Sequence, residues 1–414
     1  MPMSAALQAL HWLEGVEPVA GEPGPPPALA DVVIVGGGYV GSSIAYWLAK
    51  RGVPGVVLER RGVATGATGR NAGFIAPGLG MAFADAAQRY GREAAIERLE
   101  FTRRGREIAL GLIDELGIDC DLETQGGLTI ASSPEEWESI QASGEALMRE
   151  GFPQRLLSRD ELREHVAADL PDRFLGALYN PETALVNPAK LSSGVARAAQ
   201  RLGAQLFTGA EVFALTDLPD GRIAVETGRG EIVAGRVMLA TNAWTPLIAG
   251  LLKGRIAPVR GQILATAPAP RVFLRGMSTN WGYEYWSQRQ DGAIVLGGAR
   301  WAVPDRDEGY YAEELRPQIQ DALYAFLTGS FPVLADVPIA RRWSGIMGFS
   351  LDGYPFIGPV PGRERLLVAA GFTGHGGPYW AVAGQCLAEL IATGRADPAL
   401  RHYALDREPS ERRS

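Results

Sequence analysis

Three glycines stand at a spacing that suits a dinucleotide. Gly36, Gly38 and Gly41 follow the apolar run Val32–Val35 and open a segment with helical periodicity. In a G-x-G-x-x-G turn the first glycine permits the tight turn, the second lets backbone approach a pyrophosphate, and the third lets the helix close on the sheet. The amino terminus of such a helix offers N–H groups and a positive partial charge to phosphates. The motif therefore predicts a dinucleotide site.

A carboxylate follows at the end of the next apolar run. Glu59 stands 18 residues after Gly41, where a carboxylate accepts hydrogen bonds from the ribose hydroxyls of a dinucleotide. A carboxylate there would repel a 2′-phosphate, so Glu59 disfavours NADP. It does not separate NAD from FAD, and Arg60 beside it is assigned to the adenosine end.

The elements that must position these residues lie far apart in the chain. Residues 31–60 read as strand, turn, helix and strand, and residues 366–394 read as strand, glycine loop and helix. This order predicts an α/β fold with a Rossmann-like domain assembled from discontinuous segments and an inserted α+β domain with a mixed or antiparallel sheet. We expect residues 1–30 to form an amino-terminal extension. The predicted nucleotide-binding domain comprises residues 31–84, 181–255 and 340–414, and the inserted substrate domain 85–180 and 256–339.

Composition narrows the class of protein. The chain has 414 residues, 46% of them hydrophobic, and its 40 basic against 47 acidic residues give a net charge of −7. That balance argues against nucleic acid as the partner. Cys120 and Cys386 form no metal-ligand spacing, so we predict no metal site and a reduced, cytoplasmic protein. The uncharged run Leu366–Ala388 is too rich in glycine for a membrane helix, and we predict no transmembrane segment.

A second glycine turn lies in "GFTGHGG", 371–377. Its glycines leave backbone amides uncovered, and the helix that begins near Pro378 points its amino terminus back at them. Such a nest would stabilise negative charge on the ring of a reduced flavin. His375 in this turn is a candidate for proton chemistry, whereas the family resemblance described below implies a structural contact along the flavin.

The ordered set of motifs resembles the FAD-dependent D-amino-acid oxidase superfamily, which contains glycine oxidase, sarcosine oxidase and γ-glutamylputrescine oxidase. The likeness is carried by the first turn and by four later stretches: "GVATGATGRNAGFIAPG" (62–78), "ATNAWTPLI" (240–248), "WSGIMGFSLDGYPFIGPVPG" (343–362) and "GFTGHGGPYWAVAGQCLAELIATG" (371–394). It implies a GR2-type FAD-binding domain. The FAD-binding residues it implies are Gly36, Gly38, Tyr39, Val40, Gly41, Glu59, Arg60, Thr68, Gly69, Arg70, Asn71, Ala72, Gly73, Val212, Thr241, Asn242, Trp244, Gly345, Gly371, Thr373, Gly374, His375, Gly376 and Gly377.

Departures from these relatives bear on the cofactor and the substrate. Gly345 stands where sarcosine oxidases tether FAD through a cysteine, so FAD is predicted to be noncovalent. Met347 stands where glycine and D-amino-acid oxidases clamp the substrate carboxylate with an arginine, and Pro378 where sarcosine oxidases place a lysine. A methionine cannot replace a bidentate guanidinium. Either Arg289 or Arg300 holds a carboxylate, or the substrate is an amine without one, and the second reading is preferred.

The resemblance implies oxidation of a C–N bond. The amine loses a proton, the neighbouring carbon passes a hydride to flavin N5, and the imine hydrolyses. Trp281, Tyr283 and Tyr285 alternate at strand spacing, so one strand face is predicted to be aromatic and to bracket the amine, with core packing as the alternative. The candidate catalytic residues are His375, Met347, Tyr283, Tyr285 and Arg300.

Other readings stay open at this point. An α-hydroxy-acid oxidase on the same fold is one, a non-catalytic flavin-binding assembly protein is another, and an NAD-dependent dehydrogenase is the least favoured. Val295 replaces the lysine that promotes oxygen reactivity in sarcosine oxidase, so the electron acceptor is O2 or a quinone or dye. The sequence does not give the oligomeric state.

Overall fold

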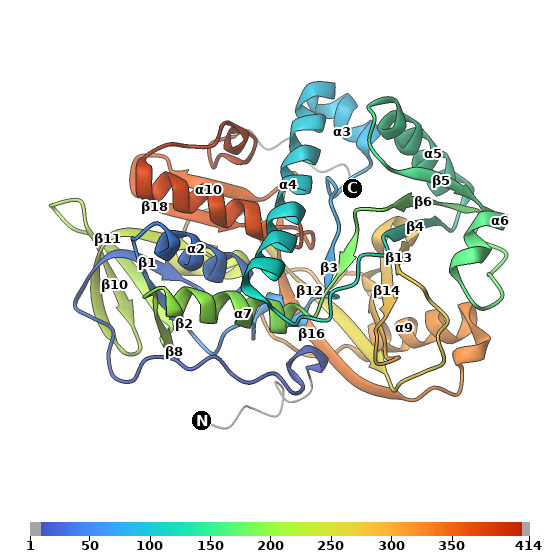
Figure 1. The fold of residues 1–414 in the computed structure, drawn as a ribbon, viewed down its shortest axis with the longest axis horizontal. Coiled ribbons are helices and arrows are strands. Elements are labelled where there is room, and N and C mark those ends of the chain that lie inside the picture. The colour runs from blue at the N-terminus through green and yellow to red at the C-terminus, as the bar shows by residue number, and fades with distance from the viewer. Residues whose placement is uncertain (1–9, 408–414) are drawn as a thin grey trace.

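Two eight-stranded sheets organise the computed structural model, which describes residues 10–407. A two-stranded ribbon, β3 (Phe74–Ile75) with β7 (Ala184–Leu185), lies apart from both sheets. In Figure 1 the first sheet occupies the left half of the molecule and the second sheet the right half. Early and late colours mix in both halves, because the chain crosses between the sheets several times.

The first sheet has a parallel centre. Its strands are β1 (Leu29–Val35), β2 (Val56–Glu59), β8 (Gln205–Thr208), β9 (Val212–Asp217), β10 (Ile223–Thr227), β11 (Gly230–Leu239), β17 (Phe356–Val360) and β18 (Arg363–Ala370). Strands β18, β11, β1, β2 and β8 lie side by side and parallel, whereas β17, β10 and β9 are antiparallel additions. The carboxyl-terminal parts of β1, β11 and β18 are apolar and buried, as expected for strands covered on both faces.

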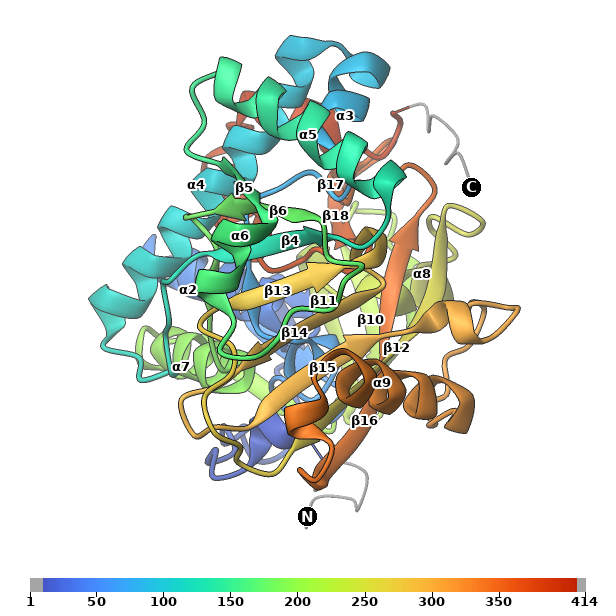
Figure 2. The ribbon, with the colours of Figure 1, turned by 90° about the vertical axis from the view of Figure 1, so that its right-hand side faces the viewer.

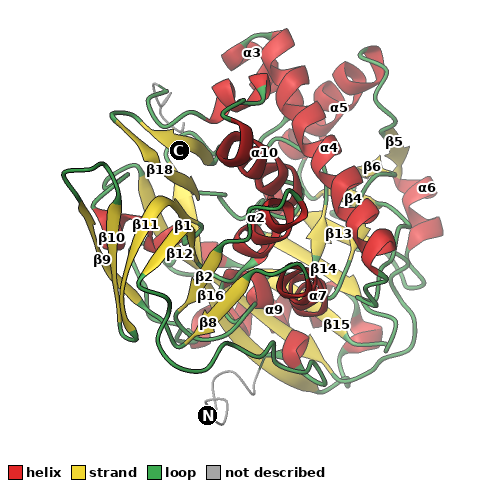
Figure 3. Cartoon of the chain, turned by 60° about the vertical axis from the view of Figure 1, so that its left-hand side comes forward, coloured by secondary structure: helices red, strands yellow, loops and turns green. Residues whose placement is uncertain are grey.

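Three helices cover one face of these parallel strands: α2 (Tyr39–Lys50), α7 (Pro188–Arg201) and α10 (Trp380–Thr393). Helix α2 lies between the other two and contacts both (Figure 1). Figure 3 shows β9 and β10 on the opposite side of the sheet from these helices. Helices α2 and α10 approach closely at Gly384, where a Cβ would lie 2.1 Å from Ser43 Oγ. Small residues therefore bring the first and last βα units together.

The second sheet is mostly antiparallel. Its strands are β4 (Gly127–Ala131), β5 (Arg155–Ser158), β6 (Gly176–Asn180), β12 (Ile256–Thr266), β13 (Gly276–Thr279), β14 (Glu284–Gln288), β15 (Ile294–Gly298) and β16 (Ile339–Ser350). Their order is β16-β12-β15-β14-β13-β4-β6-β5, with β13 and β4 parallel. Helix α9 (Pro317–Ser330) packs on β12 and β15, and α5 (Pro134–Arg149) packs on β4, β5 and β6 (Figure 2).

The remaining helices are α3 (Phe83–Tyr90), α4 (Arg92–Leu116), α6 (Arg159–Leu162) and α8 (Thr245–Ala249). Helix α4 contacts α10, and it comes closest to the second glycine turn at Gly105. A Cβ on Gly105 would lie 1.8 Å from the carbonyl oxygen of Pro378, so only glycine fits there. Within residues 10–407, no helix combines the length and the apolar character needed to cross a bilayer.

The predicted amino-terminal extension packs on the body of the protein wherever the structure describes it. Leu10, Trp12 and Val19 are buried in the main core cluster. The Trp12 Nε1–H donates to the carbonyl oxygen of Asn71 at 2.6 Å. Strand β1 begins at Leu29, two residues before the expected start, so the described part of the extension, residues 10–28, leads directly into the first sheet.

The predicted fold class is confirmed: an α/β body built from distant segments stands beside a mixed sheet. The uncharged run from residue 366 is strand β18, a glycine loop and helix α10, as expected. The predicted domain boundaries stay a prediction. One of them, at residue 340, falls at the start of β16, which pairs along its length with β12 in the second sheet.

Candidate active site

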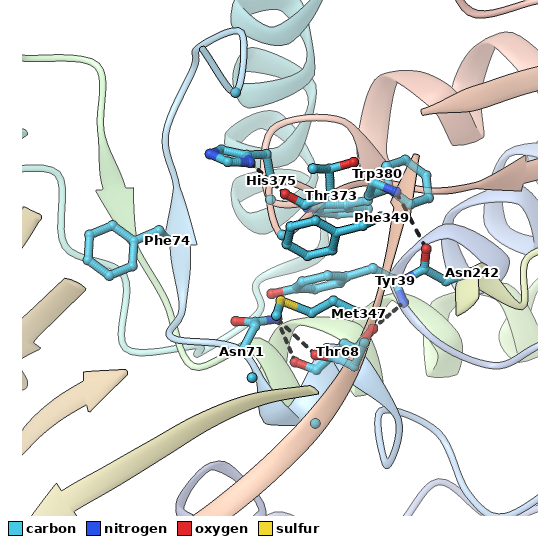
Figure 4. A pocket seen from close by; sticks show the side chains of 18 of the residues that line it. Tyr39, Thr68, Asn71, Phe74, Asn242, Met347, Phe349, Thr373, His375 and Trp380 are labelled. Carbon is cyan, nitrogen blue, oxygen red and sulfur yellow. Dashed lines mark hydrogen bonds between the residues drawn. The ribbon is translucent and has the colours of Figure 1, made fainter. Parts of the chain in front are cut away.

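A single cavity of about 1060 Å³ connects the two glycine turns. Gly36 and Gly38 line it at one end, and Gly374 and Gly376 line it elsewhere. Figure 4 shows Tyr39 and Thr68 from the first region in one view with Thr373 and His375 from the second. The cavity slightly exceeds the ~300–1,000 Å³ of ordinary ligand pockets, so an extended dinucleotide and a small substrate can share it.

The first turn is shaped to receive an anion. Gly36 has φ +107°, a conformation that side chains rarely adopt. The N-cap residue of helix α2 is Gly38, which has no side chain that could cap the first turn. The Tyr39 N–H donates to Thr68 Oγ1 at 3.0 Å, which ties the loop to the helix start. The helix dipole and the first-turn amides other than that of Tyr39 suit a diphosphate.

Glu59 lines the cavity at the end of β2. Its carboxylate accepts hydrogen bonds from Gly37 N at 2.7 Å and Arg61 N at 2.8 Å, which fixes its orientation and leaves further acceptor sites on both oxygens. The Arg60 guanidinium stacks over the Trp244 ring at 4.2 Å. Burial lowers the pKa of Arg60 from its ordinary value. All three side chains line the cavity.

The loop after β2 is held by buried Arg70. Its Nε donates to Thr65 O at 3.0 Å and its Nη1 to Ser344 O at 2.6 Å, and Nη2 pairs with Glu313 at 3.0 Å. Burial lowers the pKa of Arg70 to about 10. A Cβ on Gly345 would lie 2.7 Å from Arg70 Cβ, so the closeness of this loop to β16 explains why glycine occupies position 345.

The second turn is fixed to the first sheet by Asn242. This residue follows β11 with φ +45°, and its Oδ1 accepts from Gly371 N at 3.0 Å and Phe372 N at 3.5 Å. The turn then continues through Thr373, with φ +51°, into the start of α10. The His375 Nδ1 lies 2.8 Å from Thr373 O. A carbonyl only accepts, so Nδ1 donates and Nε2 is the proton-accepting atom of the neutral ring.

Aromatic and thioether side chains form the wall next to the second turn. Met347 and Phe349 reach it from β16, and Tyr283 and Tyr285 reach it from around the start of β14. The Arg300 guanidinium stacks on Tyr283 at 5.6 Å and Phe349 at 5.0 Å. Burial raises the pKa of the Tyr285 hydroxyl above its ordinary value, so this phenol stays protonated. The five candidate catalytic residues all line the cavity.

Two expectations about placement need correction. The aromatic run is not one strand, because Trp281 lies in a turn (Asn280–Gly282) with φ +57° and β14 begins only at Glu284. Trp281 nevertheless lines the cavity beside the two tyrosines. Arg289 does not line it: its buried guanidinium pairs with Glu123 at 3.1 Å and donates to Asp121 O.

Four predicted FAD-binding residues lie behind the cavity lining. These four positions need glycine for the path of the backbone. Cβ atoms on Gly41, Gly69 and Gly73 would lie 1.8, 2.1 and 2.4 Å from backbone oxygens. Gly371 has φ +77°, which favours glycine. The others predicted for FAD line the cavity.

Residues that the sequence did not single out also line the cavity. These are Phe74, Gly80, Phe349 and the residues on one face of α5. Phe349 could have been found from β16, since it alternates with Met347 and Gly345 along that strand. No local signal marks the others, because they reach the cavity only through tertiary packing.

The fold and the site define a dinucleotide-dependent enzyme, and its residues fit FAD: the start of α2, the oriented carboxylate of Glu59 and the second glycine turn all line one cavity of sufficient size. The sequence profile of the family described as FAD dependent oxidoreductase matches residues 31–390. The chain belongs to this family. The cofactor is therefore FAD and not NAD, as the resemblance to the D-amino-acid oxidase superfamily implied.

Individual relatives agree with the family. The chain is 28% identical over 373 residues to gamma-glutamylputrescine oxidoreductase of Escherichia coli (strain K12), covering 87% of this chain and 83% of that protein. It is 27% identical over 421 residues to sarcosine oxidase subunit beta of Rhizobium meliloti (strain 1021), covering 98% and 94%. The crystal structure of glycine oxidase from Geobacillus kaustophilus superposes with a TM-score of 0.80 at 23% identity, over 92% of this chain and 100% of that one, which shows the shared fold. The protein is an oxidoreductase of amino compounds.

Proposed function

We propose that this protein oxidises the C–N bond of an amine that carries no carboxylate on the reacting carbon. The observation that carries the proposal is the wall next to the second turn, where Met347 and Phe349 from β16 face the cavity with Tyr283 and Tyr285. An amino-acid carboxylate is best bound by a guanidinium through two parallel hydrogen bonds, and a thioether cannot make them. An aromatic wall suits an amine, which it can bracket by stacking or cation–π contact.

The side chains of the cavity have three tasks in this reaction. The tyrosine rings and Phe349 exclude water and orient the reacting C–H. His375 Nε2 is the proposed acceptor for the proton that the substrate ammonium must lose. When bound, FAD supplies the two-electron acceptor for the hydride that leaves the carbon. The substrate becomes an imine, which water hydrolyses to a carbonyl compound and an amine.

A second candidate substrate class is an α-amino acid held by Arg300, because this guanidinium lines the same wall. Its faces rest on Tyr283 and Phe349, and its Nη1 donates to Arg306 O at 3.2 Å. Those contacts fix its position and leave other donors of the guanidinium for a carboxylate. We place this candidate second, because a carboxylate bound to Arg300 would have to lie among the apolar rings that surround this guanidinium.

Noncovalent FAD is part of the proposal. Among the described residues, neither Cys120 nor Cys386 lines the cavity, and burial raises the pKa of both thiols to about 12. The acceptor that reoxidises the flavin is proposed to be O2 or a quinone. Val295 is buried in β15, away from the cavity lining, so no lysine promotes oxygen reactivity from that position.

The test is anaerobic mixing of the purified holoprotein with amines, amino acids of both configurations and 2-hydroxy acids. We expect amines without a carboxylate to bleach the visible flavin absorbance fastest. Bleaching by amino acids alone would move the assignment to the second candidate. Bleaching by hydroxy acids alone, or by no compound, would overturn the proposal, and air admitted afterwards would report whether O2 restores the colour.

A further inference from the structure

Two buried indoles lie directly behind the loop that follows β2. The Trp343 Nε1–H, from β16, donates to Arg70 O at 3.1 Å, and the Trp12 Nε1–H donates to Asn71 O at 2.6 Å. Trp12 and Trp343 are 2% and 3% exposed, and neither lines the cavity, whereas Arg70 and Asn71 both do. The indoles therefore hold the outer side of a loop whose inner side faces the cavity.

The Trp12 ring also packs against the backbone of this loop. A Cβ on Gly73 would lie 3.5 Å from Trp12 Cζ2 and 3.6 Å from Cη2. The His11 ring meets Trp12 edge-on at 4.9 Å and stacks on Trp343 at 6.3 Å, so it links the two indoles. A shift of Trp12 would therefore free the loop between residues 71 and 73 from both a hydrogen bond and a packing contact.

Trp12 comes from residues 10–28, which we call the amino-terminal segment. Other contacts hold this segment on the first sheet and on α7. The Gln200 side chain of α7 donates to Ala20 O at 2.8 Å, and Glu22 N donates to Leu206 O of β8 at 2.6 Å. The segment is thus attached to the body of the protein independently of the loop, and it presents Trp12 from a fixed position.

The loop that Trp12 holds joins two ends of the cavity. At one end, Thr68 Oγ1 accepts from the first N–H of α2 (Figure 4). At the other end, Arg70 Nη1 donates to Ser344 O on β16 at 2.6 Å, and β16 also supplies the wall next to the second turn. Asn71 follows Arg70 directly, so the Trp12 hydrogen bond acts at the β16 end of the loop.

We propose that Trp12 is a positioning residue for FAD, and that through it the amino-terminal segment sets the affinity of the β16 end of the cavity for the flavin. A loop that is already held in its binding position costs less to order when the cofactor binds. Without the Trp12 hydrogen bond the loop leaves this position, and FAD has to restore it. The segment is then part of the FAD site, although no residue between 10 and 28 lines the cavity. This inference goes beyond the proposed reaction and does not depend on which amino compound is oxidised.

The experiment measures how tightly the holoprotein keeps FAD. Replacing Trp12 by benzothienylalanine keeps the shape of the ring and removes its N–H. On dilution of the holoprotein, the fluorescence of released FAD should report a Kd about fivefold higher than in wild type. Trp12→Phe, which also leaves space behind Gly73, should weaken FAD in the same direction.

ADP tests whether the effect lies at the β16 end. ADP carries only the diphosphate and adenosine, which we expect at the first turn and Glu59. Its Kd, from displacement of FAD, should stay at the wild-type value in both Trp12 variants. An equal loss of affinity for FAD and ADP would overturn the inference, because a general weakening of the fold would act on both ligands.

Trp286→Phe is the matched control. Trp286 is fully buried in β14 of the second sheet, lies outside the cavity lining, and its Nε1 has no hydrogen-bond partner among the described residues. This variant should lose thermal stability, as Trp12→Phe does, and keep the wild-type Kd for FAD. Equal Kd values for FAD in the Trp12 and Trp286 variants would overturn the role given to Trp12. The benzothienylalanine variant keeps the test open should Trp12→Phe fail to fold.

Discussion

Replacing Asn242 by alanine should weaken FAD binding without unfolding the protein. Asn242 adopts φ +45°, which asparagine tolerates better than alanine by about 1 kcal/mol. Its Oδ1 accepts the hydrogen bond from Gly371 N at 3.0 Å, worth about 1 kcal/mol. The sum of about 2 kcal/mol is a minor part of the ~5–15 kcal/mol that stabilises a typical domain.

Of these two contributions, the hydrogen bond affects the affinity for FAD, because it holds the second glycine turn in place. We expect the Kd for FAD to rise about fivefold from that bond alone, and by up to about thirtyfold if the backbone strain is also relieved by moving the turn. Titration of the apoprotein with FAD, followed by quenching of flavin fluorescence, measures this change. Thermal unfolding of the apoprotein measures the loss of stability separately.

Asn280 offers a matched control. It has φ +54°, its Nδ2 donates to Glu284 Oε2 at 3.0 Å, and it does not line the cavity. Asn280→Ala should lose a similar amount of stability and keep its FAD affinity. Equal Kd values for FAD in the two variants would refute the claim that Asn242 acts by positioning the second turn.

Three other outcomes follow from the structure. Met347→Arg should raise kcat/KM for small amino acids by about tenfold and lower it for amines, because a guanidinium then enters the reactive end; unchanged relative rates would contradict the role given to this wall. Burial lowers the pKa of His11 below its usual 6.5, so the unfolded chain binds more protons just below that pH and stability should fall on acidification through it. The melting temperature between neutral and mildly acidic pH should therefore drop more steeply in wild type than in His11→Phe, and parallel curves would contradict this. Acid-precipitated holoprotein should release all its yellow colour to the supernatant, whereas colour retained in the pellet would indicate a covalent flavin.

Local sequence signals predicted the elements around both glycine turns. The run from Val32 to Glu59 carries its own apolar strands, glycines and helical period, and all were found where expected. The glycines of 371–377 likewise marked a loop before a buried helix. The order of elements along the chain indicated that these two units belong to one domain, but the pairing of β11 with both β1 and β18, which joins them in one sheet, was seen only in the structure.

What the sequence could not supply depends on partners far away in the chain. Arg289 looked free to bind a carboxylate, yet it pairs with Glu123, 166 positions earlier. Trp281 matched strand spacing, but a left-handed turn at that residue breaks the strand.

The most direct test of the account is a crystal structure of the protein with FAD bound. We predict that the diphosphate lies against the start of α2 at Gly36 and Gly38, and that the flavin ring lies in the same cavity, alongside Met347 and the turn at 373–377. A flavin ring outside this cavity, or a diphosphate away from α2, would contradict it.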